Sequence, residues 1–139
     1  LAETLCRPLP LSRPHPPIMV GGGGEQKTLR LVARYADACN LFAFDLEQVR
    51  QKLDVLRRRC EEEGRDYDAI EKTTLGLPPV SRDGTEGTIS INEAVERIGA
   101  LAELGIEHHM IGRPSSDEAF DLLATELLPR VQSIAVAAS

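Results

Sequence analysis

Short apolar runs alternate along the chain with longer stretches in which apolar residues recur every three or four positions. The short runs predict four strands, at residues 18–20, 38–42, 70–77 and 106–111. The longer stretches predict four helices, from residue 25 through Ala36, over residues 46–63, from Asn92 to Leu104, and from Ser116 or Asp117 to about Leu128. Short apolar strands followed by amphipathic helices are typical of a parallel sheet with helical crossovers.

Turn and capping residues stand at the ends of these predicted elements. Asp45 is suited to cap the second helix, and Gly64 follows that helix where a left-handed residue belongs. Asn92 is the predicted N-cap of the third helix, and a glycine closes it. Two prolines end the third strand, and the polar, glycine-containing residues 81–88 predict a surface loop.

The order of the elements is strand then helix, four times over, which predicts an α/β fold made of four parallel βα units. A doubly wound sheet and a partial (β/α)8 barrel both satisfy this order. We expect one domain over residues 1–139, with an extended, proline-rich lead-in at 1–17, the βα units at 18–132 and a tail at 133–139. The chain does not begin with Met and opens in a loop-like segment, so we expect a piece of a longer protein.

Composition narrows the class of protein. The 139 residues are 42% hydrophobic and 27% charged, as in ordinary globular domains, and the net charge of −6 argues against a nucleic-acid binder. No apolar run approaches the roughly 20 residues that span a bilayer, so we expect no membrane partner. The three cysteines lack CxxC spacing, which indicates idle thiols in a reducing cytoplasm and no metal site.

One chemically distinctive motif separates the first predicted strand from the first predicted helix: Gly21, Gly22, Gly23 and Gly24, followed by Glu25. A glycine-rich turn after a parallel strand lets backbone N–H groups approach an anion, and the next helix adds unpaired donors. Phosphate is the natural ligand, and Lys27 or Arg30 would add positive charge. The run is neither a P-loop nor a GxGxxG fingerprint. A merely tight turn is the alternative, although four glycines exceed what a turn needs and each costs about 0.5–1 kcal/mol relative to Ala.

Other polar residues give weaker signals. His108 and His109 are neighbours in a predicted strand, so they point to opposite faces; a half-buried structural pair is the simpler interpretation than a metal site. Arg113 follows that strand at the glycine end of the sheet, where it either contacts an anionic ligand or pairs with Asp117. Asn40, near the end of the second strand, either lines the same mouth or serves in a turn.

Four blocks of the sequence carry a family resemblance. Residues 16–25 read Pro-Pro-Ile-Met-Val-Gly-Gly-Gly-Gly-Glu, and residues 28–40 read Thr-Leu-Arg-Leu-Val-Ala-Arg-Tyr-Ala-Asp-Ala-Cys-Asn. Residues 52–66 end in Gly-Arg-Asp, and residues 102–106 read Ala-Glu-Leu-Gly-Ile. Together these blocks resemble the luciferase-like monooxygenase superfamily, and within it the branch that uses the deazaflavin coenzyme F-420. The resemblance covers nearly the whole chain.

Members of this family are (β/α)8 TIM barrels that bind a flavin or deazaflavin at the carboxyl face, so the resemblance implies the C-terminal half of such a barrel. It implies that the family's phosphate-binding turn corresponds to Gly21, Gly22, Gly23 and Gly24, with Glu25 and Gln26 opening the helix. The implied cofactor is coenzyme F-420, with FMN as the alternative. The first four βα units supply the family's usual acid and base residues and are missing here, so no catalytic residue is carried over.

The leading hypothesis is therefore the C-terminal half of an F-420-dependent oxidoreductase that binds the cofactor phosphate, with hydride transfer to an organic small-molecule substrate in the complete protein. The alternatives are an FMN-dependent luciferase-like monooxygenase, a non-catalytic half-barrel that binds a phosphorylated ligand or self-associates, and a doubly wound nucleotide-binding module. A half-barrel leaves two sheet edges and an apolar interior uncovered. We therefore expect a homo-oligomer or association with a complementary half-barrel, and no activity of this chain alone.

Overall fold

Four parallel strands form the sheet of this α/β protein. The computed structural model describes residues 7–85 and 87–137; Cys6 and the rest of the first six residues, Glu86, and the last two residues of the predicted tail lie outside them. The sheet has the order β1-β2-β3-β6, and its strands are β1 (Met19–Gly21), β2 (Ala38–Phe42), β3 (Glu71–Leu75) and β6 (His108–Met110). The prediction of four parallel βα units is confirmed.

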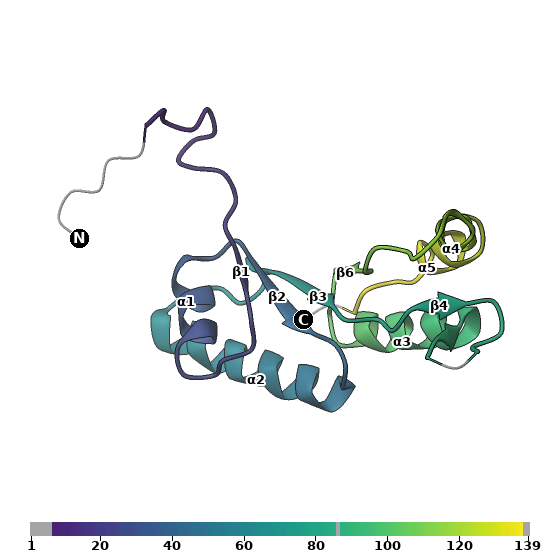
Figure 1. Cartoon of the computed structure of the whole chain (residues 1–139). Helices are drawn as coiled ribbons and strands as arrows, with labels where there is room; N and C mark the ends of the chain where they lie inside the picture. Colours follow the sequence, from purple (N-terminus) through teal and green to yellow (C-terminus); the bar gives the residue numbers. More distant parts are fainter. Residues whose placement is uncertain (1–6, 86, 138–139) are drawn as a thin grey trace.

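Each strand of this sheet leads into a helical segment. The helices are α1 (Thr28–Tyr35) after β1, α2 (Leu46–Glu63) after β2, and α3 (Ile91–Glu103) after β3. After β6 the chain forms a continuous helical stretch of α4 (Asp117–Leu122), the π-helix η1 (Leu123–Leu127) and α5 (Leu128–Val131). Figure 1 shows α1 and α2 together on one side of β1, β2 and β3. No helix among the described residues is long and apolar enough to cross a membrane.

The long helix α2 begins and ends where its sequence predicts. The Asp45 carboxylate accepts a hydrogen bond of 2.8 Å from the backbone N–H of Glu47, which satisfies one donor of the first turn. Gly64 follows the helix with φ of +64°, a left-handed conformation that costs a glycine little. Both capping predictions are confirmed.

The start of α3 differs from the prediction, and Asn92 is not its cap. The N-cap is Ser90, whose hydroxyl accepts from the N–H of Glu93 while the Glu93 carboxylate accepts from the N–H of Ser90. This reciprocal capping box satisfies two donors at once, and it lets Ile91 bury its side chain at the first helical position. Asn92 lies within the first turn and accepts a hydrogen bond from Arg130.

Several other element boundaries are shifted. Residues 25–27 form a turn in which the N–H of Leu29 donates to the carbonyl of Gly24, so α1 begins at Thr28 and not at residue 25. β6 is shorter than predicted because it pairs only with the last three residues of β3. Part of the predicted loop is strand: β4 (Val80–Ser81) pairs in parallel with β5 (Ile89–Ser90), which leaves residues 82–88 as the connection.

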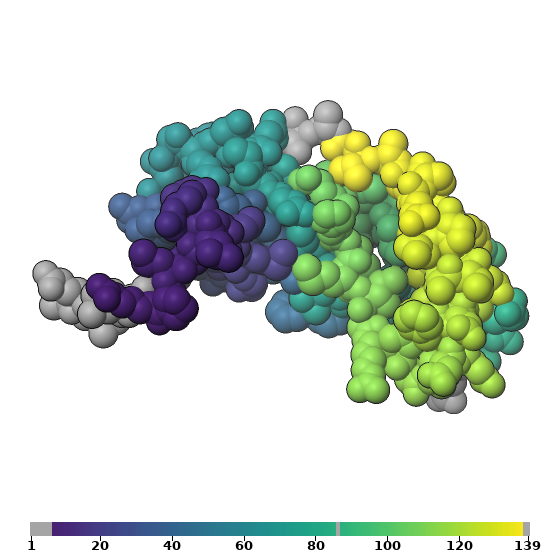
Figure 2. Space-filling model, turned by 90° about the horizontal axis from the view of Figure 1, so that it is seen from above, coloured from purple at the N-terminus to yellow at the C-terminus, as the bar shows by residue number. Residues whose placement is uncertain are grey.

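The buried side chains form two hydrophobic clusters. The larger lies under α1 and α2 and includes Leu29, Leu41 and Leu56. The smaller lies under α3 and the last helical stretch and contains Ile89, Ile91, Ala94 and Leu127. Helix α1 packs along α2, whereas α2 and α3 are barely in contact. Figure 2 shows the result as an arch, with the purple-to-teal units on one side and the green-to-yellow units on the other.

The two faces of the sheet have different surroundings. Alternate residues of the strands point to opposite faces, and the pairing register places Val20, Cys39, Lys72 and His109 on the helix-covered face. The other face, which corresponds to a barrel interior, carries Met19, Gly21, Asn40, Phe42 and Met110. Here Met19, Phe42 and Met110 are 46%, 57% and 41% exposed. We call this surface the open face.

Candidate functional site

The glycine turn leaves β1 at the carboxyl edge of the sheet. The N–H of Gly22 donates to the carbonyl of Asn40 over 2.9 Å, which fixes the turn to β2. Gly22 has φ of +113°, a conformation that residues with a side chain rarely adopt. Among the described residues, the next four backbone N–H groups, those of Gly23, Gly24, Glu25 and Gln26, have no acceptor. Four successive donors are thus free to meet an anion from outside the chain.

Gly21 opens the turn toward the open face. It is the last residue of β1 and the register partner of Asn40, so both lie side by side on that face. A Cβ added at Gly21 would have nothing within 4 Å. The Asn40 amide donates to the sulfur of Met110 over 3.3 Å, while its Oδ1 is buried without a hydrogen-bond partner in the described structure. An empty side-chain position thus stands beside an unpaired polar atom.

Glu25 turns away from the open face and binds α2. Its carboxylate lies 2.6 Å from the Lys52 ammonium and accepts a further hydrogen bond from Gln51 over 3.0 Å. The hydrogen bond from Lys52 is the main cause that lowers the pKa of Glu25. The Lys52 stem also lies 3.5 Å from the position of a Cβ at Gly23. Lys52 therefore supports the turn, and sequence reasoning missed it because 27 residues separate it from Glu25.

The other polar residues near the turn differ in whether their side chains are free to contact a ligand. Gln26 and Lys27 are exposed, and neither side chain has a hydrogen bond or an ion pair within the described part of the chain. Arg30 does not serve the turn, contrary to one expectation, because its guanidinium pairs with Glu63 over 2.8 Å on the helix side. The positive charge at the turn therefore comes from Lys27, because Glu25 neutralises Lys52.

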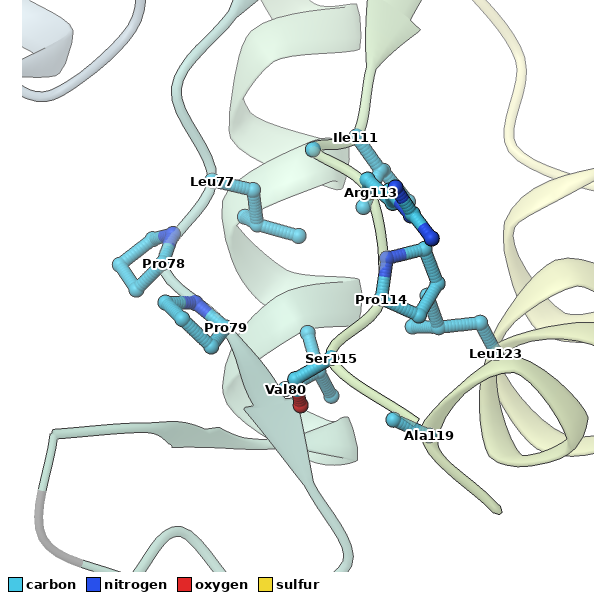
Figure 3. A pocket seen from close by; sticks show the side chains of 11 residues that line it. Leu77, Pro78, Pro79, Val80, Ile111, Arg113, Pro114, Ser115, Ala119 and Leu123 are labelled. Carbon is cyan, nitrogen blue, oxygen red and sulfur yellow. The ribbon is translucent and has the colours of Figure 1, made fainter. Parts of the chain in front are cut away.

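A second hollow lies along the same edge of the sheet, between the segments that follow β3 and β6. It has a volume of about 160 Å³. Figure 3 shows residues 77–80 facing residues 111–115 across it, with Arg113 on the β6 side. Arg113 is exposed and forms no ion pair with Asp117, so that alternative is wrong.

The two histidines of β6 separate as predicted. His108 reaches Glu71 on the open face. His109 lies on the helix-covered face, where its Nδ1 is 2.8 Å from the Thr74 hydroxyl. Within the residues the structure describes, no group of three His, Cys, Asp or Glu side chains could hold a metal ion. Cys39 and Cys60 are buried free thiols, and burial raises the pKa of each.

The residues at the glycine turn fit a cofactor phosphate. Free backbone donors, space at Gly21 and the exposed ammonium of Lys27 are the chemistry that a phosphate group requires. The buried Oδ1 of Asn40, which has no hydrogen-bond partner among the described residues, lies beside Gly21 on the same face of the sheet. The Glu25 carboxylate beside the turn is already paired with the Lys52 ammonium on α2.

Comparisons with known proteins agree with this fold. The family model for luciferase-like monooxygenases matches residues 2–87, which is more than half of the chain and includes the glycine turn. No curated protein matches the sequence of this chain. The coenzyme F-420-dependent tetrahydromethanopterin reductase of Methanopyrus kandleri is similar in structure, with a TM-score of 0.68 and 13% identity over 83% of this chain and 51% of the reductase. An F-420-dependent secondary alcohol dehydrogenase, in complex with an F-420–acetone adduct, is also similar. Its TM-score is 0.67 and its identity 17%, over 83% of this chain and 48% of the dehydrogenase. The chain spans about half the length of these two structures.

Proposed function

This chain belongs to the luciferase-like monooxygenase family, and from that premise we propose that it is the C-terminal half of an F-420-dependent oxidoreductase whose glycine turn binds the cofactor phosphate. Gly21 to Gly24, with the N–H groups of Glu25 and Gln26, form the phosphate site. The bound deazaflavin supplies hydride chemistry for an organic substrate. The chain's own task is to anchor and orient that cofactor at the carboxyl edge of the sheet.

The observation that carries this proposal is the empty position at Gly21. A glycine inside a strand costs about 0.5–1 kcal/mol relative to a residue with a side chain, and nothing in the fold requires it there, because a Cβ would meet no atom within 4 Å. The absent side chain leaves room beside Asn40 and next to four free backbone donors. Room, donors and the family match all favour a phosphorylated ligand at this place.

Lys52 and Glu25 support the same site electrostatically. The two side chains neutralise each other at 2.6 Å, so the Glu25 charge does not repel an anion at the turn. Lys27, exposed just before α1, adds a positive charge at the helix start.

We place the protein in the cytoplasm, which the free thiols of Cys39 and Cys60 support.

Calorimetric titration of the 139-residue chain with coenzyme F-420 and with its phosphate-free deazaflavin tests the proposal. We expect saturable binding of coenzyme F-420 and binding about tenfold weaker without the phosphate, since hydrogen bonds to a charged group contribute about 1.5–3 kcal/mol. FMN and riboflavin form the matched second pair. Tighter binding of FMN than of coenzyme F-420 would indicate that the cofactor is a flavin and not a deazaflavin. Equal binding of the forms with and without phosphate would contradict the phosphate site.

We also propose that a complementary half-barrel or a second copy covers the open face. Met19, Phe42 and Met110 expose apolar surface there, and Phe44 stacks on Phe42 with 70% of its own surface exposed. Within the described residues β1 pairs only with β2, and β6 only with β3, so both outer edges offer unpaired backbone groups. Light scattering coupled to size exclusion tests this proposal, and a strictly monomeric chain that binds no partner half would contradict it.

A further inference from the structure

The hollow between the segments that follow β3 and β6 lies at the carboxyl edge of the sheet, as the glycine turn does (Figure 3). This edge is where the strand ends of (β/α)8 barrels form their ligand sites. Two to three strand spacings of about 4.8 Å separate the hollow from β1. Its volume of about 160 Å³ is below the roughly 300–1,000 Å³ of pockets that enclose whole small molecules, so it suits one end of a ligand.

Apolar side chains form most of the wall of this hollow. Residues 77–80 contribute two prolines and two aliphatic side chains, and Ile111, Pro114 and Leu123 stand on the other side. An apolar wall lowers the effective dielectric at its border, which strengthens the attraction between a charged side chain there and a ligand of opposite charge. The polar groups at the border therefore decide which ligand fits.

One charged side chain lines the hollow, the guanidinium of Arg113. Within the described part of the chain it forms neither an ion pair nor a hydrogen bond. Asp117 and Glu118 follow on α4, but neither lines the hollow. Arg82 and Glu126 pair with each other and do not line it either. The wall thus carries one positive charge and no negative charge.

Hydrogen-bond donors of the same segment add to this charge. Among the described residues, the backbone N–H groups of Gly112, Arg113 and Ser115 have no acceptor, and the Ser115 hydroxyl has no partner. Gly112 has no positive φ, and a Cβ there would meet nothing within 4 Å, so the fold does not require glycine at this position. A guanidinium and free N–H groups all donate, which favours negatively charged acceptor oxygens.

We propose that Arg113 and the backbone of residues 112–115 bind an anionic oxygen group, a carboxylate or a phosphate, at one end of a small organic molecule. The apolar part of that molecule contacts Leu77 and Ile111. The assignment of this molecule as the organic substrate rests on the proposed function, whereas the binding of the anion does not. Arg113 then selects substrates that carry a negative charge.

NMR titration of the 139-residue chain at constant ionic strength tests the proposal. The probes are propionate, inorganic phosphate and, as the uncharged control, propanol. We expect both anions to shift the amide resonances of Gly112 and Ser115 saturably, and propanol to leave them unchanged. The anion that binds more tightly distinguishes a carboxylate from a phosphate ligand. Phosphate bound at the glycine turn is observed separately, through the amides of Gly23 and Gly24.

Two variants with the same change of charge separate a site from general attraction. Arg113→Gln should weaken the binding of both anions at Gly112 about tenfold, as the loss of a charge-assisted hydrogen bond implies. Arg97→Gln removes an exposed cation from α3 that does not line the hollow, and it should leave the binding unchanged. Circular dichroism establishes that both variants are folded.

Amides of Gly112 and Ser115 that respond to neither anion, or an Arg113→Gln protein that binds as tightly as the unaltered chain, would overturn the proposal. Titration with coenzyme F-420 separates this failure from that of the proposed function. Anion binding at Arg113 without F-420 binding would contradict the proposed function and leave the anion site in place. F-420 binding without an anion response at Gly112 would contradict the anion site alone.

Discussion

Replacing Gly21 with Val should stabilise the protein and abolish cofactor binding. Gly21 is a strand residue without a positive φ, and its added Cβ has no neighbour within 4 Å, so Val enters without a clash. Valine recovers the roughly 0.5–1 kcal/mol that glycine costs in a strand, and strand propensity acts in the same direction. We expect the free energy of unfolding to rise by about 0.5–1 kcal/mol, which is a few degrees in Tm for a chain of this size.

Urea unfolding followed by circular dichroism measures the stability of Gly21→Val, and titration with coenzyme F-420 measures its cofactor binding. Gly22→Ala is the matched control in the turn: its φ of +113° is strained for any side chain, so we expect a loss of about 1–3 kcal/mol. Gly64→Ala repeats a positive-φ substitution at φ of +64°, remote from the turn, and should lower stability without affecting F-420 binding. A Gly21→Val protein that is destabilised, or that binds coenzyme F-420 normally, would refute the argument from the empty position.

Three further predictions concern other parts of the chain. Ser90→Ala should lower the free energy of unfolding by about 1 kcal/mol because it removes the α3 cap, whereas Asn92→Ala should change it by less than about 0.5 kcal/mol. Urea unfolding compares the two variants, and equal losses would contradict the capping box. Burial lowers the pKa of His109 from its ordinary 6.5, so the unfolded chain takes up this proton first as the pH falls. The stability present above pH 6.5 is therefore lost as the pH falls toward the lower folded pKa, and unfolding of His109→Gln measured on both sides of pH 6.5 should lack this part of the loss. Phe42→Asp should weaken association through the open face, as measured by light scattering, while the chain keeps its circular dichroism spectrum.

Local chemistry made parts of the fold predictable. The strand at residues 38–42 and the helix at 46–63 match their predictions because Asp45 and Gly64 define the helix ends within a few residues of sequence. β6 is shorter than its apolar run because only Thr73, Thr74 and Leu75 of the five-residue β3 pair with it in register. Such partner lengths are tertiary facts that no local pattern contains.

The candidate site was likewise only partly predictable from the sequence. The glycine turn is visible in the sequence because Gly22 needs a conformation that other residues avoid. Lys52 is an ordinary helical lysine in sequence, and only the packing of α1 along α2 brings it to Glu25.

The unpaired edges of β1 and β6 have a consequence in terms of symmetry. All four strands of the sheet run in the same direction, and among the described residues one free edge remains at each end. A two-fold axis parallel to the strands would bring each β6 edge against the β1 edge of the other copy, keep every strand parallel and close a ring of twice four strands. An axis perpendicular to the strands would instead pair β1 with β1 in antiparallel fashion and leave both β6 edges open to further copies. The direction of one rotation axis thus separates a closed dimer from an assembly with free ends.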